Sequence, residues 1–358
     1  MELLMINGSP KREKSNTIIL SNAFISGMKN GIDIHTTTIN LYDKNIDHCL
    51  GCYSCWRVTP GKCVLSDDVE NIIHIYLKSD IVIWSTPVHT FGMSSMVKVL
   101  IDRLLPLYLP NIEERNSALG TMHPLRYDLK SKKYVLISTC GFPKIANNTE
   151  PLITIFDLLY GDTYEKIICS QGDLYNIVQL KYITSKYIDL VYYAGQEYAR
   201  LGQLSQDTKK LLCKPLINMN DYILMANFDW TSKSNYSSLS EYNIQKAKNY
   251  VRQMKLVYEP GHMKAAVGVL QMEFDGGNYM CQFVMTPSDC TIIENKDCFY
   301  EFTLKITTTI DKWIKRAQKL SLLTAIESPT STKSEFQVLT EMISKLALNG
   351  AKREMTFS

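Results

Sequence analysis

The chain has 358 residues, of which 45% are hydrophobic and 21% charged, proportions typical of an ordinary globular protein. Its formal net charge of +3 is close to neutral for this length, which gives no reason to expect a nucleic acid or an anionic membrane as partner. Ten cysteines are too few for a small disulfide scaffold, no apolar run is long enough to span a membrane, and the first residues lack the pattern of a signal peptide. We therefore expect a cytoplasmic protein, in which clustered cysteines bind metal or carry redox chemistry more often than they form disulfides.

Up to about residue 204, short apolar runs alternate with helical patterns. The predicted strands cover residues 2–7, 32–41, 80–86, 134–139 and 166–169, and the predicted helices cover residues 15–28, 69–77, 94–105, 149–160 and 182–201. Most of these apolar runs are nearly continuous, as expected of parallel strands covered on both faces. The pattern predicts an α/β fold with a doubly wound, five-stranded, flavodoxin-like parallel sheet.

The alternation of apolar runs and helical patterns ends near residue 204. Residues 205–230 have an irregular helical pattern, residues 231–240 are polar and rich in serine like a linker, and residues 241–257 predict a helix. Residues 263–304 then alternate apolar and polar side chains, with a hairpin turn predicted at residues 276–278. We expect a flavodoxin-like domain at 1–204, a helical connector and linker at 205–240, and a small α+β domain at 241–358.

The loop at residues 8–17 joins the first strand to the first helix, where unpaired amides and the helix dipole favour a phosphate group. It has neither the glycine spacing of a dinucleotide-binding loop nor the Gly-Lys-Ser/Thr ending of a nucleoside triphosphate loop. Polar side chains that could contact a phosphate are Ser9, Ser15, Asn16 and Thr17, with Lys11 or Arg12 as countercharge. The alternative is a capped helix preceded by a solvated basic turn.

Two further loops follow predicted strands, at the sheet edge where open α/β sheets bind ligands. Small residues in them allow backbone amides to approach a flat ring system closely. The candidate residues are Thr86, Pro87, Val88, His89, Phe91 and Gly92 in one loop and Thr139, Cys140, Gly141 and Phe142 in the other. Each loop alone could be only a tight turn, but three such loops at three strand ends favour a binding site.

Together these motifs resemble the NADPH-dependent FMN reductase and iron–sulfur flavoprotein family, over about residues 1–204. The resemblance rests on Gly8-Ser9-Pro10, Ser15-Asn16-Thr17, the cysteines at 49, 52, 55 and 63 followed by Asp67-Asp68, and Pro87-x-His89 with Lys98 and Asp102-Arg103. It implies FMN, with the phosphate at Ser9, Ser15, Asn16 and Thr17 and the isoalloxazine between residues 86–92 and 139–142. His89 departs from the family pattern, which often has a tyrosine there.

Four cysteines lie within fifteen residues, at Cys49, Cys52, Cys55 and Cys63. The first three match the start of a ferredoxin-type run that holds a [4Fe–4S] cluster, and the spacing to the fourth resembles the iron–sulfur flavoproteins. Four reduced thiols in a loop over the flavin pocket are an equal alternative, and zinc or disulfides are less favoured.

Other candidates carry less chemistry. His123 is expected in a loop at the pocket mouth, Tyr192 and Tyr193 in the core or at a dimer contact, and Cys281, Cys290 and Cys298 in the interior. The C-terminal part weakly resembles the sterol-carrier-protein-2-like fold through its alternating pattern and the helix entry at residues 307–313.

The sequence thus predicts an FMN-dependent oxidoreductase that takes hydride from NAD(P)H and passes electrons to an unknown acceptor, and we expect it to form a homodimer. No side chain is expected to act as catalyst, because the flavin itself carries the chemistry. One alternative is an electron carrier that uses FMN and an iron–sulfur cluster without a small-molecule substrate. Another is a non-redox ligand-binding protein.

Overall fold

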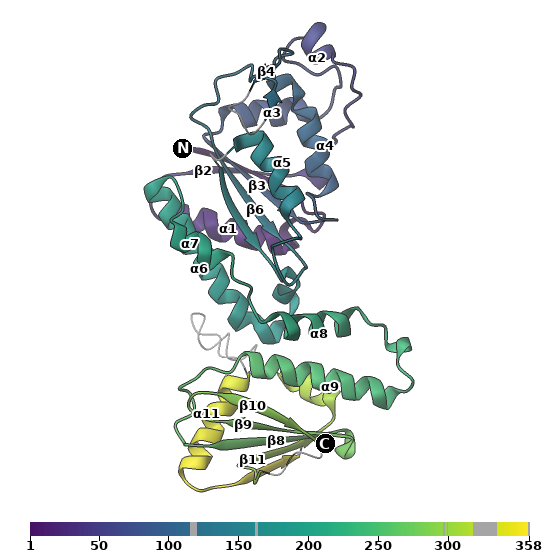
Figure 1. Cartoon of the computed structure of the whole chain (residues 1–358), viewed down its shortest axis with the longest axis vertical. Coiled ribbons are helices and arrows are strands. Elements are labelled where there is room, and N and C mark those ends of the chain that lie inside the picture. The colour runs from purple at the N-terminus through teal and green to yellow at the C-terminus, as the bar shows by residue number, and fades with distance from the viewer. Residues whose placement is uncertain (115–119, 162–163, 296–297, 299, 318–334, 357–358) are drawn as a thin grey trace. The chain divides into compact units, whose positions relative to one another are not determined.

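The computed structural model describes residues 1–114, 120–161, 164–295, 298, 300–317 and 335–356. The chain divides into two compact units (Figure 1). The first comprises Met1–Asp173 and Tyr187–Pro215, and the second comprises Leu174–Lys186 and Leu216–Ser358. Among the described residues, no helix combines the length and hydrophobicity that a bilayer crossing requires.

A five-stranded parallel sheet forms the centre of the first unit. Its order is β2-β1-β3-β6-β7, the flavodoxin-like order that the alternating pattern predicts. The strands are β1 (Glu2–Asn7), β2 (His35–Asn40), β3 (Ile81–Pro87), β6 (Lys133–Thr139) and β7 (Tyr164–Cys169). Every residue of β3 from Ile81 to Thr86 is buried, because helices cover both faces of the sheet.

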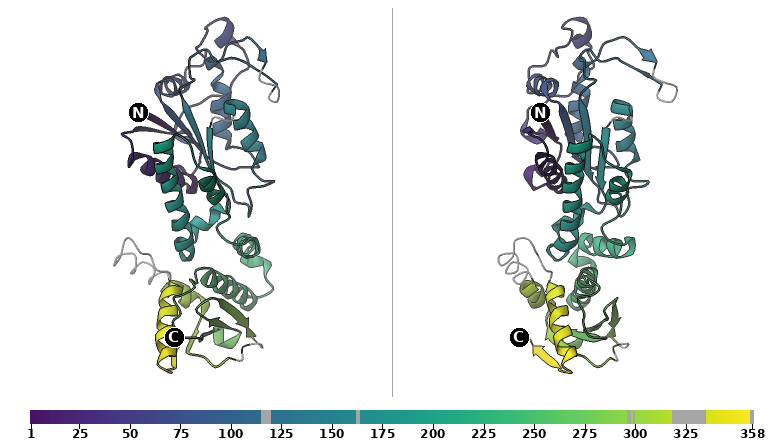
Figure 2. Two further views of the ribbon diagram at one scale, coloured as in Figure 1. Left: turned by 60° about the vertical axis from the view of Figure 1, so that its left-hand side comes forward. Right: turned by 90° about the vertical axis from the view of Figure 1, so that its left-hand side faces the viewer.

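The helices of the first unit lie on opposite faces of this sheet, as α1 and α5 do in Figure 2. One face packs on α3 (Val69–Lys78), α4 (Ser95–Arg103) and α5 (Glu150–Tyr160), and the other on α1 (Asn16–Lys29). Next to α1 runs α6 (Lys181–Leu201), followed by α7 (Gln206–Leu212). Shorter elements are α2 (Ser54–Arg57), the 3-10 helices Arg12–Lys14, Leu41–Asp43, Leu105–Leu107, Gly172–Asn176 and Val178–Leu180, and a hairpin of β4 (Glu113–Glu114) and β5 (Thr121–Met122).

Two glycines bring α1 and α6 into backbone contact. A Cβ added to Gly27 would lie 1.9 Å from the carbonyl oxygen of Tyr192, and one added to Gly195 would lie 2.0 Å from that of Phe24. Any side chain at either position would therefore push the two helices apart. This close approach sets where α1, and the loop before it, lie on the sheet.

The second unit is a five-stranded mixed sheet with helices. Its order is β10-β9-β8-β11-β12, with β8, β9 and β10 antiparallel and β11 parallel to both β8 and β12. The strands are β8 (Gly268–Phe274), β9 (Tyr279–Met285), β10 (Cys290–Glu294), β11 (Leu304–Thr308) and β12 (Arg353–Thr356). The helices are α8 (Met219–Trp230), α9 (Leu239–Leu256) and α11 (Glu335–Leu348), and residues 310–317 are also helical.

The core of the second unit joins the sheet to these helices and to residues of the 174–186 segment. Phe283 and Phe336 pack with ring centroids 4.9 Å apart, and Leu174 and Leu180 belong to the same apolar cluster. The predicted hairpin is present between β8 and β9, where Asp275, Gly276 and Gly277 all have positive φ. The α+β character expected of this region is therefore confirmed.

Some sequence expectations differ from the structure in detail. The serine-rich segment at 231–240 contains a 3-10 turn (Lys233–Asn235) and the first residues of α9, whose N-cap is Ser238. Tyr193 is 62% exposed, so of the two places expected for it, the core is wrong and a dimer contact stays a prediction. Cys281 and Cys290 are buried as expected, whereas Cys298 is only half-buried.

Candidate functional site

The loops that follow β1, β3 and β6 lie side by side, because the carboxyl ends of parallel strands meet at one edge. The amide of Gly8 donates to the carbonyl of Ser85 at 2.8 Å, and the amide of Val88 donates to that of Thr139 at 2.8 Å. The structure thus brings together the three loops singled out from the sequence. This edge of the sheet is the candidate functional site.

Ser15 and Thr17 shape the first loop through contacts with the protein itself. The Ser15 hydroxyl caps α1 by accepting from the amide of Thr17 at 3.2 Å. The Thr17 hydroxyl is fully buried and lies 2.6 Å from that of Thr139, which joins the first loop to the end of β6. Both hydroxyls therefore hold the loop in place.

Asn16 and Ser9 are fixed in the same way. The Asn16 amide group donates to the carbonyl of Gly172 at 2.9 Å. The Ser9 amide donates to Asn7 Oδ1 at 3.1 Å, while the Ser9 hydroxyl accepts from the amide of Lys11 at 3.3 Å. Asn7 is fully buried and also donates to Asn40 Oδ1 at 2.8 Å, so it ties the loop to β2.

The two basic residues of this loop differ in their surroundings. The Arg12 guanidinium forms an ion pair with Asp43 and donates to the carbonyl of Tyr42 at 3.2 Å. Within the described part of the chain, the Lys11 ammonium has no ion-pair or hydrogen-bond partner. Of the two candidate countercharges, only Lys11 is therefore available to a ligand.

The loop after β3 is held tightly at its base and strained at its tip. Ser94, the N-cap of α4, donates from its amide to the Thr86 hydroxyl at 3.1 Å and from its own hydroxyl to the carbonyl of Gly8. Thr90 and Phe91 have φ values of 46° and 68°, in the left-handed region that side chains disfavour. Such strain persists where the surrounding structure imposes it, and it is common in binding loops.

Phe91 and Phe142 form an exposed aromatic pair across two of the loops. Their rings are stacked, with centroids 5.6 Å apart and planes 8° from parallel. The two residues are 43% and 41% exposed, so the pair presents apolar surface to solvent. A planar ligand would gain contact area from this pair.

A fourth segment, which the sequence did not single out, completes the edge. After β7, the Gln171 amide donates to the carbonyl of Phe142 at 3.0 Å and the Gly172 amide to that of Cys140 at 2.8 Å. Gln171 is fully buried and has a φ of 59°, in the left-handed region where glycine is the usual residue. Because this position is not a glycine, the sequence does not indicate the conformation. These bonds set the position of the loop that carries Phe142.

Asp173 brings a carboxylate to this edge. A Cβ added to Gly141 would lie 3.1 Å from Asp173 Oδ2, so the carboxylate lies close to the backbone of this loop. Burial, followed by the charge of Asp173, raises the pKa of the Cys140 thiol, although a hydrogen bond from Phe142 opposes the rise. Cys140 therefore stays a neutral, buried thiol beside the site.

The cysteine segment, defined here as residues 48–66, gives its four thiols different surroundings. Cys49 and Cys52 are exposed, Cys55 is buried and Cys63 is half-buried. Hydrogen bonds from the Ser54 hydroxyl and amide lower the pKa of Cys52, whereas burial and then the neighbouring Cys63 raise that of Cys55. Among the described residues, which include all four cysteines, no three potential ligands converge closely enough to hold a metal ion.

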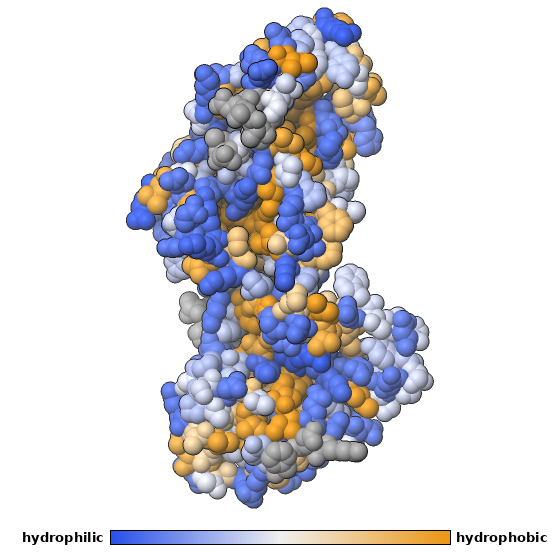
Figure 3. Space-filling view, in the orientation of Figure 1, coloured by the Kyte–Doolittle hydropathy of each residue, from blue (hydrophilic) through white to orange (hydrophobic). Residues whose placement is uncertain are grey.

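Aromatic residues pack around the cysteine segment. The rings of Trp56 and His123 lie 4.7 Å apart, and the Trp56 indole donates to the carbonyl of Leu105 at 3.3 Å. His123 thus supports the cysteine segment, a contact that the sequence did not predict. Figure 3 shows hydrophobic residues exposed near α2, and this part of the chain includes Leu50, Val58, Val64 and Ile112, which are 49–73% exposed.

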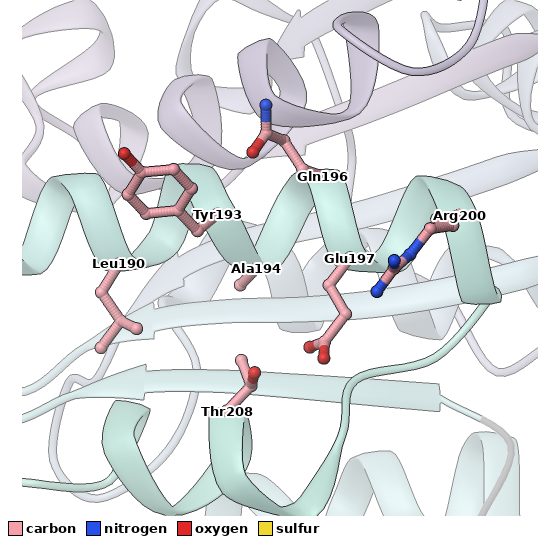
Figure 4. Close-up of a pocket in the computed structure, with 7 residues that line it drawn as sticks. All are labelled: Leu190, Tyr193, Ala194, Gln196, Glu197, Arg200 and Thr208. Atoms are coloured by element: carbon pink, nitrogen blue, oxygen red, sulfur yellow. The ribbon is translucent and has the colours of Figure 1, made fainter.

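A separate pocket of about 460 Å³ lies between α6 and α7 (Figure 4). Glu197 points toward Thr208 across it and accepts from the amide of Ser205 at 3.2 Å, which stabilises the first turn of α7. None of the strand-end residues lines this pocket. Its geometry is explained by the capping of α7.

Part of the first unit matches a known protein family. Residues 1–120 match the model of the family described as NADPH-dependent FMN reductase. The match ends before β6, so the segment that follows β7 and the whole second unit lie beyond it.

Curated relatives are iron–sulfur flavoproteins. One from Methanocaldococcus jannaschii is 34% identical over 122 residues, which are 34% of this chain and 61% of the relative. One from Clostridioides difficile is 30% identical over 104 residues, which are 29% of this chain and 45% of the relative. The chain therefore spans about half the length of the relatives that it matches.

Solved structures are similar at a lower level. An FMN-dependent NADH-azoreductase from Bacillus anthracis is 16% identical, with a TM-score of 0.42 over 56% of this chain and 98% of the other. An NAD(P)H:quinone oxidoreductase from Methanothermobacter marburgensis is 15% identical, with a TM-score of 0.40 over 56% and 96%. Similarity of this size does not identify a function.

Proposed function

We propose that the chain is an FMN-dependent oxidoreductase that accepts hydride from NAD(P)H and passes the electrons to an acceptor. The observation that carries this proposal is the convergence of the loops after β1, β3 and β6, of which the first two lie in the segment that matches the FMN reductase family model. The site also suits the cofactor chemically. It combines helix N-terminal amides and a free lysine for a phosphate with an exposed apolar pair for a flat ring.

In this proposal, the first turn of α1 with Ser9 and Lys11 would hold the phosphate, and residues 86–92 and 139–142 would flank the ring. Bound FMN would supply hydride and single-electron chemistry that no side chain provides. The chain's own residues bind and orient the ring, and the buried hydroxyls of Thr17 and Thr139 keep the loops at a fixed spacing. No general acid is needed for hydride transfer itself.

Lys11 and Arg12 provide the test, because they are adjacent and carry the same charge. Lys11→Ala should weaken FMN binding about five- to tenfold, measured by titration of the apoprotein through flavin fluorescence, since an unpaired cation is lost. Arg12→Ala should change it less than twofold, because Arg12 already pairs with Asp43. Equal effects of the two substitutions, or a colourless protein that cannot be reconstituted with FMN, would refute the proposed site.

A second candidate function is an iron–sulfur flavoprotein that carries electrons without a small-molecule substrate. The cysteine spacing and the names of the curated relatives favour it. The four thiols, as arranged, do not form a ligand set, so we derive no step through a cluster. Iron and labile sulfide in protein purified without oxygen, lost on Cys52→Ala while FMN is retained, would establish this alternative. Iron-free protein would leave the reductase as the function.

A further inference from the structure

Arg103 is the largest charged side chain in the interior of the first unit. It ends α4, and its side chain is only 1% exposed. Its partner Asp67 has a fully buried carboxylate, which accepts from Nη1 at 2.6 Å and from Nη2 at 3.0 Å. This two-bond geometry is specific to arginine, because a lysine ammonium cannot form a fork.

The pair closes the neck of the cysteine segment. Just before the segment, Arg103 Nη1 donates to the carbonyl of Asp47 at 2.6 Å, and the amide of Asp47 donates to Asp67 Oδ2 at 2.9 Å. Just after the segment, Asp67 Oδ1 accepts from the amide of Val69 at 3.1 Å. The residues just before and just after the segment are therefore joined through one ion pair.

A second carboxylate strengthens the neck. The amide of Asn45 donates to Asp68 Oδ2 at 2.7 Å, and the amide of Asp68 donates to the carbonyl of Asn45 at 3.1 Å. All four cysteines lie in the excursion that this neck closes. The adjacent acidic residues at 67 and 68 thus tie the chain back on itself.

The end of α4 also supports the buried part of the segment. Cys55 is 8% exposed, and the indole of the adjacent Trp56 donates to the carbonyl of Leu105, two residues after Arg103, at 3.3 Å. Arg103 Nε is buried and has no hydrogen-bond partner within the described residues. The guanidinium is therefore held at the neck through its Nη1 and Nη2 atoms.

We propose that Arg103 is a positioning residue that closes the neck of the cysteine segment and keeps Cys55 buried. The N-terminal end of α4 fits the same role, because its N-cap, Ser94, is bonded to Gly8 and Thr86 at the candidate site. One helix therefore links the cysteine segment to the strand-end loops.

The test measures how fast N-ethylmaleimide labels each cysteine in the full chain, after anaerobic removal of metal with a chelator. Arg103→Lys keeps the charge and loses the fork, so the neck should open and buried Cys55 should react at least tenfold faster. Lys98→Ala, which removes an exposed ion pair with Asp102 on the same helix, should change the rate less than twofold. Buried Cys169, on β7 of the first unit, should stay unlabelled in both and reports that this unit is intact.

A second variant guards against unfolding of Arg103→Lys. The double change Arg103→Met with Asp67→Leu replaces the buried pair by apolar side chains of similar size, which proteins often tolerate. If this apolar pair does not restore the neck, Cys55 should again react faster while Cys169 stays unlabelled. In the unchanged protein, the amides of Asn45 and Asp47 should exchange hydrogen more slowly than those of residues 49–53. An unchanged Cys55 rate in a folded variant, or fast exchange at Asn45 and Asp47, would overturn the proposal.

Discussion

Both units bury polar side chains, but they distribute them differently. In the first unit, buried hydroxyls gather at one edge of the sheet, where Ser21 bonds to Ser85 at 2.9 Å and Ser138 to the carbonyl of Thr86 at 2.6 Å. In the second unit, buried amide and hydroxyl side chains are spread over α9, α11 and β9, and Thr340 bonds to the carbonyl of Phe336 in its own helix. Buried polar groups need partners in either case. Their concentration at one edge, rather than their number, marks the candidate site.

The largest effect expected from this comparison is on the stability of the second unit alone. Phe283→Ala should lower its free energy of unfolding by about 3–5 kcal/mol, because a fully buried ring is removed. FMN absorbance should persist, since the strand-end loops lie in the first unit. Urea unfolding followed by Trp fluorescence and flavin absorbance would measure both. Leu348→Ala on α11, at a residue 60% exposed, is the control, and parallel loss of FMN in Phe283→Ala would contradict the division.

The next effect concerns the hydroxyls at the edge of the first unit. Replacing Ser15 and Thr17 together by Ala should weaken FMN binding at least tenfold, because it removes a helix cap worth about 0.5–2 kcal/mol and the bond to Thr139. Fluorescence titration measures the change, and Ser26→Ala, an exposed position on the same helix, should leave it unaltered. Unchanged binding in the double variant would place the cofactor elsewhere.

A smaller effect is expected from removing most of the second unit. A fragment of residues 1–215 keeps the whole first unit, and its FMN affinity should stay within about threefold of the full chain. It should be less soluble, because Leu174 and Leu180 lose the apolar cluster that buries them. A folded fragment that binds FMN only after residues 216–358 are added would show that the second unit completes the site.

The smallest effect concerns the pocket between α6 and α7. Burial would raise the pKa of Glu197, but hydrogen bonds from Ser205 and Thr208 outweigh it and lower the pKa. A depressed pKa stabilises the fold above the unfolded value of about 4.3, and this contribution is lost as the pH falls below it. Glu197→Gln should therefore cost less than about 1 kcal/mol at pH 7 and nothing near pH 3. Thermal unfolding at both pH values, with exposed Asp207→Asn as the control, measures it.

The fold of the first unit could be predicted because its elements are local patterns. Buried runs such as Ile81 to Thr86 and the apolar spacing of α1 are set by neighbours in sequence. The strand β12 carries no such pattern, since three of its four residues are exposed and it pairs with β11. Its existence depends on a partner far away in the chain.

The candidate site could be predicted only in part, for the same reason. The glycines and hydroxyls of the three loops are visible in the sequence, but the partners that turn side chains toward or away from a ligand are not. Arg12 pairs with Asp43 and is therefore not available to a ligand. Gln171 bonds to the loop of Phe142 from the end of another strand. Nothing local to either residue indicates these contacts.

Helix α4 imposes a length and a phase on the first unit. Its nine residues rise about 1.5 Å each, so the Ser94 cap and the Arg103 fork are held about 14 Å apart along the axis. One residue inserted between them would turn Arg103 by about 100°, away from Asp67. Four inserted residues would nearly restore its direction but move it about 6 Å farther along the axis. The number of residues in α4 therefore sets the distance between the strand-end loops and the cysteine segment.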